Sequence, residues 1–157
     1  MTKVILDMST SLDGFITASN RRPEEPMGDG GEQLHGWFFG EDERDRDVLA
    51  RAGESLGALV CGRRTYDDSV RFWGADGPTG AARLPLLVVT HEAPKESPEG
   101  GVYTFVTDGI ESALEKAKDS AGDGDVAVMG GADIGRQFIE AGLVDEIGVH
   151  LVPVLFG

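Results

Sequence analysis

Two glycine turns along the chain carry the residue types that bind phosphate. In residues 125–135 a short apolar run ends at Gly130-Gly131, and a helical pattern begins at once. Glycine lets a phosphate approach the backbone, and the free amides and dipole of a helix start stabilise its charge. The spacing differs from the G-x-G-x-x-G dinucleotide fingerprint. A plain strand-to-helix turn is the alternative interpretation.

The second turn adds paired cations. The apolar run 59–61 meets Gly62, which is followed by Arg63, Arg64 and a threonine that can cap the next helix. Guanidinium groups bind phosphate in a bidentate way, so either arginine suits the 2′-phosphate that distinguishes NADP from NAD. The alternative is a pair of solvated arginines that bond surface carboxylates. Thr90 ends a third apolar run and offers a hydroxyl in a comparable position.

A polar turn after the first apolar run is a third candidate. Residues 9–17 begin at Ser9, pass through a Ser-Leu-Asp-Gly turn and return to Phe15 and Ile16. Apolar side chains after a glycine turn can pack on a flat ring, or they can staple the turn to the core. Residues 37–39, Trp-Phe-Phe, leave the same choice between core packing and a wall for an aromatic substrate.

The elements that position these turns alternate along the chain. Short runs rich in β-branched residues predict strands at residues 3–8, 58–61, 86–90, 102–106, 126–129 and 146–154. Apolar residues at three- and four-residue steps predict helices at 42–56, 110–119 and 134–141. Residues 19–36 are predicted to form a long loop.

Nearly continuous apolar strands favour an α/β fold whose largely parallel sheet is covered on both faces. In such sheets, ligands bind beyond the carboxyl ends of the strands, so the turns are predicted to form one nucleotide crevice.

Composition and charge restrict the partners. A length of 157 residues favours one domain spanning 1–157, and 28 acidic against 14 basic residues give a net charge of −14. That charge repels nucleic acid and anionic membranes. No apolar stretch is long enough to cross a membrane and no leader is visible, so we expect a cytoplasmic protein.

The cysteine and the histidines point to no metal or disulfide. The lone Cys61 lies in the apolar run 58–61 and is predicted to be a buried small hydrophobe. The three histidines are far apart and lack partners at ligand spacing, so no metal site is expected.

Three motifs resemble those of the dihydrofolate reductase-like family in order and spacing. They are Ser11-Leu-Asp-Gly-Phe-Ile, Gly62-Arg-Arg-Thr-Tyr and Met129-Gly-Gly-Ala-Asp-Ile. The similarity is greatest to the branch that contains the reductase domain of riboflavin biosynthesis. It implies a three-layer α/β/α fold with a mostly parallel central sheet and NADPH laid across the strand ends. The implied cofactor contacts are Ser9, Ile16, Gly62, Arg63, Arg64, Thr65, Thr90, Gly130, Gly131, Ala132, Asp133 and Ile134.

The resemblance implies an NADPH-dependent reductase. Its expected substrate is a small heterocycle, either a ribosylaminopyrimidine or a pterin-like molecule, in which hydride reaches a C=N or C=O bond. Asp45, on the apolar stripe of helix 42–56, is the candidate proton donor. The alternative is a non-catalytic nucleotide-binding or interaction protein on the same fold.

The last apolar run predicts the assembly. Residues 146–156 are long, rich in β-branched residues and weakly charged, and Pro153 interrupts only part of the run. Such exposed strands pair with another chain unless they are covered. We therefore expect a homodimer whose two-fold contact involves residues 146–156.

Overall fold

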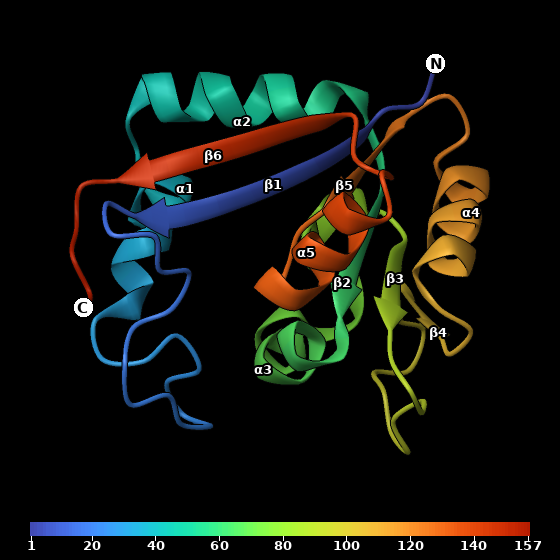
Figure 1. Ribbon diagram of the computed structural model, residues 1–157, viewed down its shortest axis with the longest axis horizontal. Helices are drawn as coiled ribbons and strands as arrows, with labels where there is room; N and C mark the ends of the chain where they lie inside the picture. Colours follow the sequence, from blue (N-terminus) through green and yellow to red (C-terminus); the bar gives the residue numbers. More distant parts are fainter. The chain divides into compact units, whose positions relative to one another are not determined.

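One parallel sheet organises the chain in the computed structural model, which describes residues 1–157 (Figure 1). The strand order is β4-β3-β2-β5-β1-β6. The strands are β1 (Val4–Ser11), β2 (Leu56–Gly62), β3 (Leu86–Val89), β4 (Tyr103–Val106), β5 (Asp125–Val128) and β6 (Glu146–Val152). Every predicted strand is present within a few residues of its expected bounds. The predicted α/β fold is confirmed.

Helices lie in every connection between consecutive strands except that from β3 to β4, where residues 90–102 form a loop. The helices are α1 (Gly36–Phe39), α2 (Glu43–Ser55), α3 (Arg63–Trp73), α4 (Ile110–Ala121) and α5 (Ala132–Glu140). The helices expected at 42–56, 110–119 and 134–141 correspond to α2, α4 and α5. None of these helices is long and apolar enough to span a membrane.

Two details of the helices differ from expectation. The residue before α3 is Gly62, so Thr65 lies in the first turn of the helix and the prediction that it caps the helix is wrong. The apolar side chains of α2, which were expected to pack against other elements, remain accessible to solvent. The helix has no buried residue, and Val48 is 47% exposed. Polar residues dominate α2, so its few apolar side chains do not form a continuous face.

The chain divides into two compact units. The first comprises residues 1–6 and 56–147, and the second comprises residues 7–55 and 148–157. β1 and β6 contribute residues to both units. A single domain over 1–157 stays a prediction.

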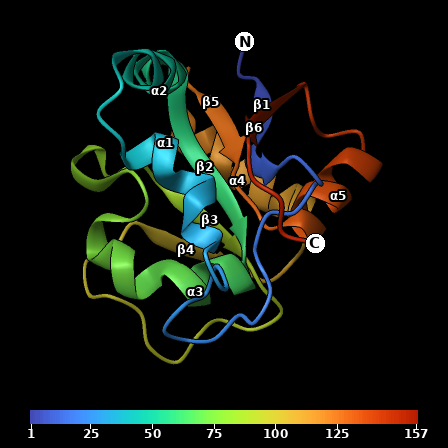
Figure 2. The ribbon, with the colours of Figure 1, turned by 90° about the vertical axis from the view of Figure 1, so that its left-hand side faces the viewer.

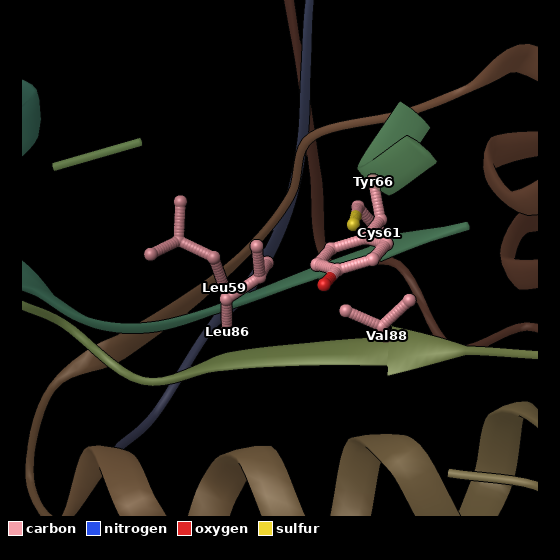
Figure 3. Close-up of a cluster of buried hydrophobic side chains, with 5 residues drawn as sticks. All are labelled: Leu59, Cys61, Tyr66, Leu86 and Val88. Carbon is pink, nitrogen blue, oxygen red and sulfur yellow. The ribbon is translucent and has the colours of Figure 1, made fainter. Parts of the chain in front are cut away.

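The core of the first unit forms on both faces of β2 and β3. Figure 3 shows one face, where Tyr66 of α3 packs against Leu59, Cys61, Leu86 and Val88. Successive side chains of a strand point to opposite faces, so Val60 and Leu87 face the other side, where α4 packs. Cys61 is fully buried, and the prediction of a small core hydrophobe is confirmed.

The second unit contains the long segment that precedes α1. Residues 19–36 form turns and one 3-10 helix, Gly31–His35, which is consistent with the predicted loop. Arg22 forms ion pairs with Glu25 and Asp29, and Leu34 is fully buried. These contacts hold the segment in a defined path despite its few regular elements.

Candidate functional site

The turns after β2 and β5 meet in the first unit. The amide of Gly62 donates to the carbonyl oxygen of Gly130 at 2.8 Å. A Cβ on Gly131 would lie 3.5 Å from Oγ1 of Thr65, so the two turns are in van der Waals reach. The prediction that these two segments come together is confirmed.

Both turns lead into a helix whose first amides are free. Gly62 and Gly131 precede α3 and α5, and neither helix start has a side-chain cap. Figure 2 shows α3 beginning directly at the end of β2. In α5 the helical hydrogen bonds begin with the amide of Gly135, which donates to the carbonyl oxygen of Gly131. The amides of Ala132, Asp133 and Ile134 are therefore the unpaired donors of that helix start, as the implied phosphate contact requires.

Glycine is required at Gly62 by packing. A Cβ there would lie 2.7 Å from Cγ1 of Ile134, a separation that neighbouring atoms do not tolerate. Ile134 is itself buried, so the side chain has little room to move. The contact keeps the start of α5 against the end of β2.

The guanidinium of Arg63 is hydrogen-bonded to other groups of the chain. Its Nη1 donates to Oγ1 of Thr90 at 3.2 Å and to the carbonyl oxygen of Glu92 at 2.6 Å, and its Nε donates to Asp67 at 2.8 Å. Thr90 also donates its hydroxyl to the carbonyl oxygen of Glu92 at 2.7 Å. Arg63 and Thr90 thus hold the loop after β3 against the start of α3.

Arg64 differs from its neighbour. It is exposed and makes no hydrogen bond or ion pair. A guanidinium in that state has all its donors free for an incoming anion. The two arginines that the sequence could not separate therefore have different roles.

The carboxylate of Asp133 faces its own helix. Arg136 donates to it at 2.7 Å and Gln137 at 2.8 Å, and the hydrogen bond from Arg136, followed by that from Gln137, lowers the pKa of Asp133. Its charge is thus offset locally. Only its backbone amide is suited to an anion.

The second unit contains an aromatic and polar cluster around Ser9. Nε1 of Trp37 donates to Oγ of Ser9 at 3.1 Å, and the Trp37 ring packs against that of His150 with centroids 4.4 Å apart and planes tilted by 32°. Phe38 and Phe39 are 45% and 79% exposed, so the core alternative does not hold for these two rings.

The Ser-Leu-Asp-Gly turn has a structural role within this unit. Oγ of Ser11 donates to Asp13 at 2.5 Å, and the carboxylate of Asp13 also accepts the amides of Phe156 and Gly157. These bonds, that from Ser11 first, lower the pKa of Asp13. The nearby Ile16 is half-buried, and its place beside a nicotinamide ring stays a prediction.

Sequence reasoning missed the pairing of Asp7 with His150. Nε2 of His150 lies 2.6 Å from Oδ1 of Asp7, although no donor is aligned on that buried oxygen for a regular hydrogen bond. The available signal was weak: Asp7 and His150 are each flanked by apolar residues, Leu6 and Met8 in β1 and Val149 and Leu151 in β6. Asp45, the proton donor predicted from the sequence, lies in the first turn of α2, and its side chain has no hydrogen bond or ion pair.

A family model matches nearly the whole chain. The model of the RibD C-terminal domain covers residues 2–157. The chain belongs to the RibD C-terminal domain family. One relative, the uncharacterized protein YyaP of Bacillus subtilis, is 26% identical over 165 residues, which cover 99% of this chain and 77% of YyaP.

Solved structures share the fold of this RibD C-terminal domain protein. A putative riboflavin biosynthesis protein from Shewanella has a TM-score of 0.64 and 20% identity, covering 100% of this chain and 80% of that one. RibD of Acinetobacter baumannii has a TM-score of 0.63 at 17% identity, covering all of this chain and 48% of RibD.

The third structure is a diaminohydroxyphosphoribosylaminopyrimidine deaminase/5-amino-6-(5-phosphoribosylamino)uracil reductase from Thermotoga maritima. Its TM-score is 0.62 at 16% identity, and the match covers 99% of this chain and 46% of that protein. The chain thus spans about half the length of the latter two proteins.

Proposed function

We propose that this protein is an NADPH-dependent reductase. The observation that carries the proposal is the meeting of two uncapped helix starts, those of α3 and α5, at adjacent turns. Their positive dipole ends and free amides favour an anion in a chain whose net charge of −14 otherwise repels one. An anion held there has to bind through local donors.

The residues at these turns suit the phosphates of NADPH. The amides of residues 132–134 are the donors for the pyrophosphate, and Gly130 and Gly131 leave it room to approach. Arg64 supplies the free cation for the 2′-phosphate, and Arg63 with Thr90 fixes the neighbouring loop. When bound, NADPH supplies the hydride.

The proposed substrate is a ribosylaminopyrimidine. The Thermotoga protein, which shares the fold, is described as a deaminase and 5-amino-6-(5-phosphoribosylamino)uracil reductase, and the family model that matches this chain is that of the RibD C-terminal domain. In the second unit, Trp37 offers an aromatic ring and Ser9 a hydroxyl, which suit a flat heterocycle with polar edges. A pterin-like compound has the same features and is the second choice.

Cofactor binding tests the first half of the proposal. Calorimetric titration of the purified protein with NADPH and with NADH should give saturable binding of both and tighter binding of NADPH. No binding of either nucleotide would overturn the proposal. Binding without oxidation of NADPH, across ribosylaminopyrimidines, pterins and quinoid compounds, would favour a non-catalytic nucleotide-binding protein instead.

We also propose that the protein is a homodimer through residues 146–156. β6 is the edge strand, and its side chains Ile147, Val149 and Leu151 are 59%, 58% and 61% exposed on one face. An unpaired edge next to an apolar face favours association. We propose a second copy as the partner. Because each chain carries a net charge of −14, a contact between charged faces would be repulsive, so two copies would associate through this apolar face.

A further inference from the structure

The outer edge of β6 offers backbone hydrogen-bonding groups to a partner. β6 is the last strand of the sheet, with β1 as its only neighbour. The amide of Asp145, one residue before β6, donates to the carbonyl oxygen of Val4 in β1. Because the backbone groups of successive residues point to opposite sides of a strand, those of Gly148 and His150 point away from β1. An open edge of this kind pairs readily with another strand.

The two faces of β6 differ in exposure. Ile147, Val149 and Leu151 share one face, and all three side chains are exposed. The residues between them, 148, 150 and 152, are half-buried. A strand that pairs with the edge of β6 therefore fits best if it brings apolar side chains to the same face.

The strand is symmetric about Val149, which restricts how it can pair with a copy of itself. Its bounds, Glu146 and Val152, lie three residues away on either side. An antiparallel pair with a two-fold axis at Val149 aligns the whole strand and keeps both apolar faces on one side of the sheet. An axis between two residues would place each apolar side chain opposite a residue of the other face.

Shifting the axis by one residue worsens the match. An axis at Gly148 would place Asp145 opposite Leu151 of the second copy. An axis at His150 would place Pro153, which has no amide to donate, opposite Ile147. With the axis at Val149, residues 145 and 153 both lie outside the paired stretch.

We propose that β6 pairs antiparallel with β6 of a second copy around a two-fold axis at Val149, so that the two sheets join edge to edge. This inference rests on the proposed homodimer and adds the contact and its register. Ile147 then faces Leu151 of the second copy, and Val149 faces its own counterpart. Gly148 of each copy exchanges both backbone hydrogen bonds with His150 of the other.

The residues that this register brings opposite one another are compatible in size and charge. The three exposed apolar side chains of each copy form one cross-strand cluster. The ring of His150, which packs against Trp37, lies opposite Gly148, which has no side chain to obstruct it. Glu146 is the only acidic residue of the strand. It lies opposite Val152 and about 20 Å from its own counterpart, so the pairing brings no like charges together.

Cysteine cross-linking tests the register. Cys61 is the only cysteine of the chain and is buried, so an introduced cysteine is the only accessible thiol. Residues opposite each other at a non-hydrogen-bonded position have Cα atoms about 4.5 Å apart, a separation that a disulfide can span. Mild oxidation should therefore convert most of a Val149→Cys sample to a covalent dimer.

Three further variants control for chance contact. Ile147 lies about 14 Å from its own counterpart in this register, and so does Leu151, so neither single cysteine variant should cross-link. An equal mixture of Ile147→Cys and Leu151→Cys should cross-link, because these two positions face each other. Ile139→Cys measures cross-linking by random collision, since Ile139 is an apolar side chain of α5 that is 48% exposed.

Hydrogen exchange separates edge pairing from a dimer that stacks the two apolar faces. Edge pairing places the amides of Gly148 and His150 in hydrogen bonds between copies. In the wild-type dimer these amides should exchange on the order of 10-fold more slowly, or slower still, than in the variant with Val149→Lys and Leu151→Lys. Stacked faces would leave both amides open to water in either sample.

The outcomes distinguish this pairing from the proposals made above. A wild type that is monomeric by light scattering overturns the homodimer and the pairing together. If the wild type is a dimer but Val149→Cys does not cross-link, or Ile147→Cys cross-links with itself, the register is overturned and the homodimer stands. Equal exchange of the Gly148 and His150 amides in the two samples overturns edge pairing. NADPH oxidation tests the reductase proposal separately, and its result does not alter this one.

Discussion

Arg63 and Thr90 are hydrogen-bonded side chain to side chain at the ends of β2 and β3. The guanidinium of Arg63 donates to Oγ1 of Thr90 at 3.2 Å, and both side chains bond the carbonyl oxygen of Glu92. The adjacent Arg64 has no partner. One arginine therefore holds the loop after β3 beside the proposed nucleotide site, and the other has its donors free.

This division predicts the cofactor preference of an Arg64→Ala variant. Its affinity for NADPH should fall by about 1.5 to 3 kcal/mol, the range for a hydrogen bond to a charged group, while NADH binding stays nearly unchanged. Calorimetric titration with both nucleotides measures the difference. Arg63→Ala is the comparison: it should lower the melting temperature and weaken both cofactors alike. Equal losses of NADPH and NADH in Arg64→Ala would show that Arg64 does not contact the 2′-phosphate.

Gly131→Val should impair cofactor binding more than folding. The residue has an ordinary φ of −81°, and its Cβ would meet only Oγ1 of Thr65 at 3.5 Å. The side chain would instead occupy the approach to the amides of α5. NADPH titration and thermal melting of the same sample separate the two effects. A large drop in melting temperature with normal affinity per folded molecule would contradict the phosphate site.

Gly62→Val is the counterpart that should damage the fold. Its Cβ would lie 2.7 Å from Cγ1 of the buried Ile134. Overpacking of this kind costs about 1 to 3 kcal/mol, which chemical denaturation can measure. Unchanged stability of this variant would show that the end of β2 and the start of α5 are packed more loosely.

Cys61 should be unreactive in the folded protein. Burial raises the pKa of its thiol to about 12. The thiol therefore stays neutral, and a disulfide reagent should label it only after denaturation. Because the ordinary pKa is 9.0, folding stability should fall as pH rises from about 9 toward 12, and less so in Cys61→Ala. Rapid labelling of the native protein would contradict the buried position.

The homodimer predicts a mass by light scattering of about twice the 16.7 kDa of one chain. A variant with both Val149→Lys and Leu151→Lys should be monomeric, because the two lysines place charge on the exposed face of β6. A monomeric wild type at micromolar concentration contradicts the dimer. A dimer that survives both substitutions has its interface elsewhere.

Local sequence patterns predicted the strands and the two glycine turns well. Apolar runs such as 86–90 have one consistent structure, and glycine at 62 and 130–131 marks where they end. The same patterns predicted the helix α2 but not its exposure, because periodicity alone does not show whether a partner covers the apolar stripe. They also could not separate Arg63 from Arg64, since that distinction depends on Glu92 and Thr90.

The pairing of Asp7 with His150 lay beyond local patterns for a different reason. The two residues are near opposite ends of the chain, and only the side-by-side placement of β1 and β6 brings them together. In the sequence each is a polar residue between two apolar neighbours, with nothing that links one to the other. Strand order is a property of the whole sheet, so no short window of sequence contains it.

The most direct test of the reductase proposal is the absorbance of NADPH after 5-amino-6-(5-phosphoribosylamino)uracil is added to the purified protein. We expect the NADPH absorbance to fall in proportion to substrate, with reduced substrate as the product by mass spectrometry. If NADPH binds but persists with this substrate and with pterins, while a RibD reductase oxidises it under the same conditions, the protein is not a reductase of this class.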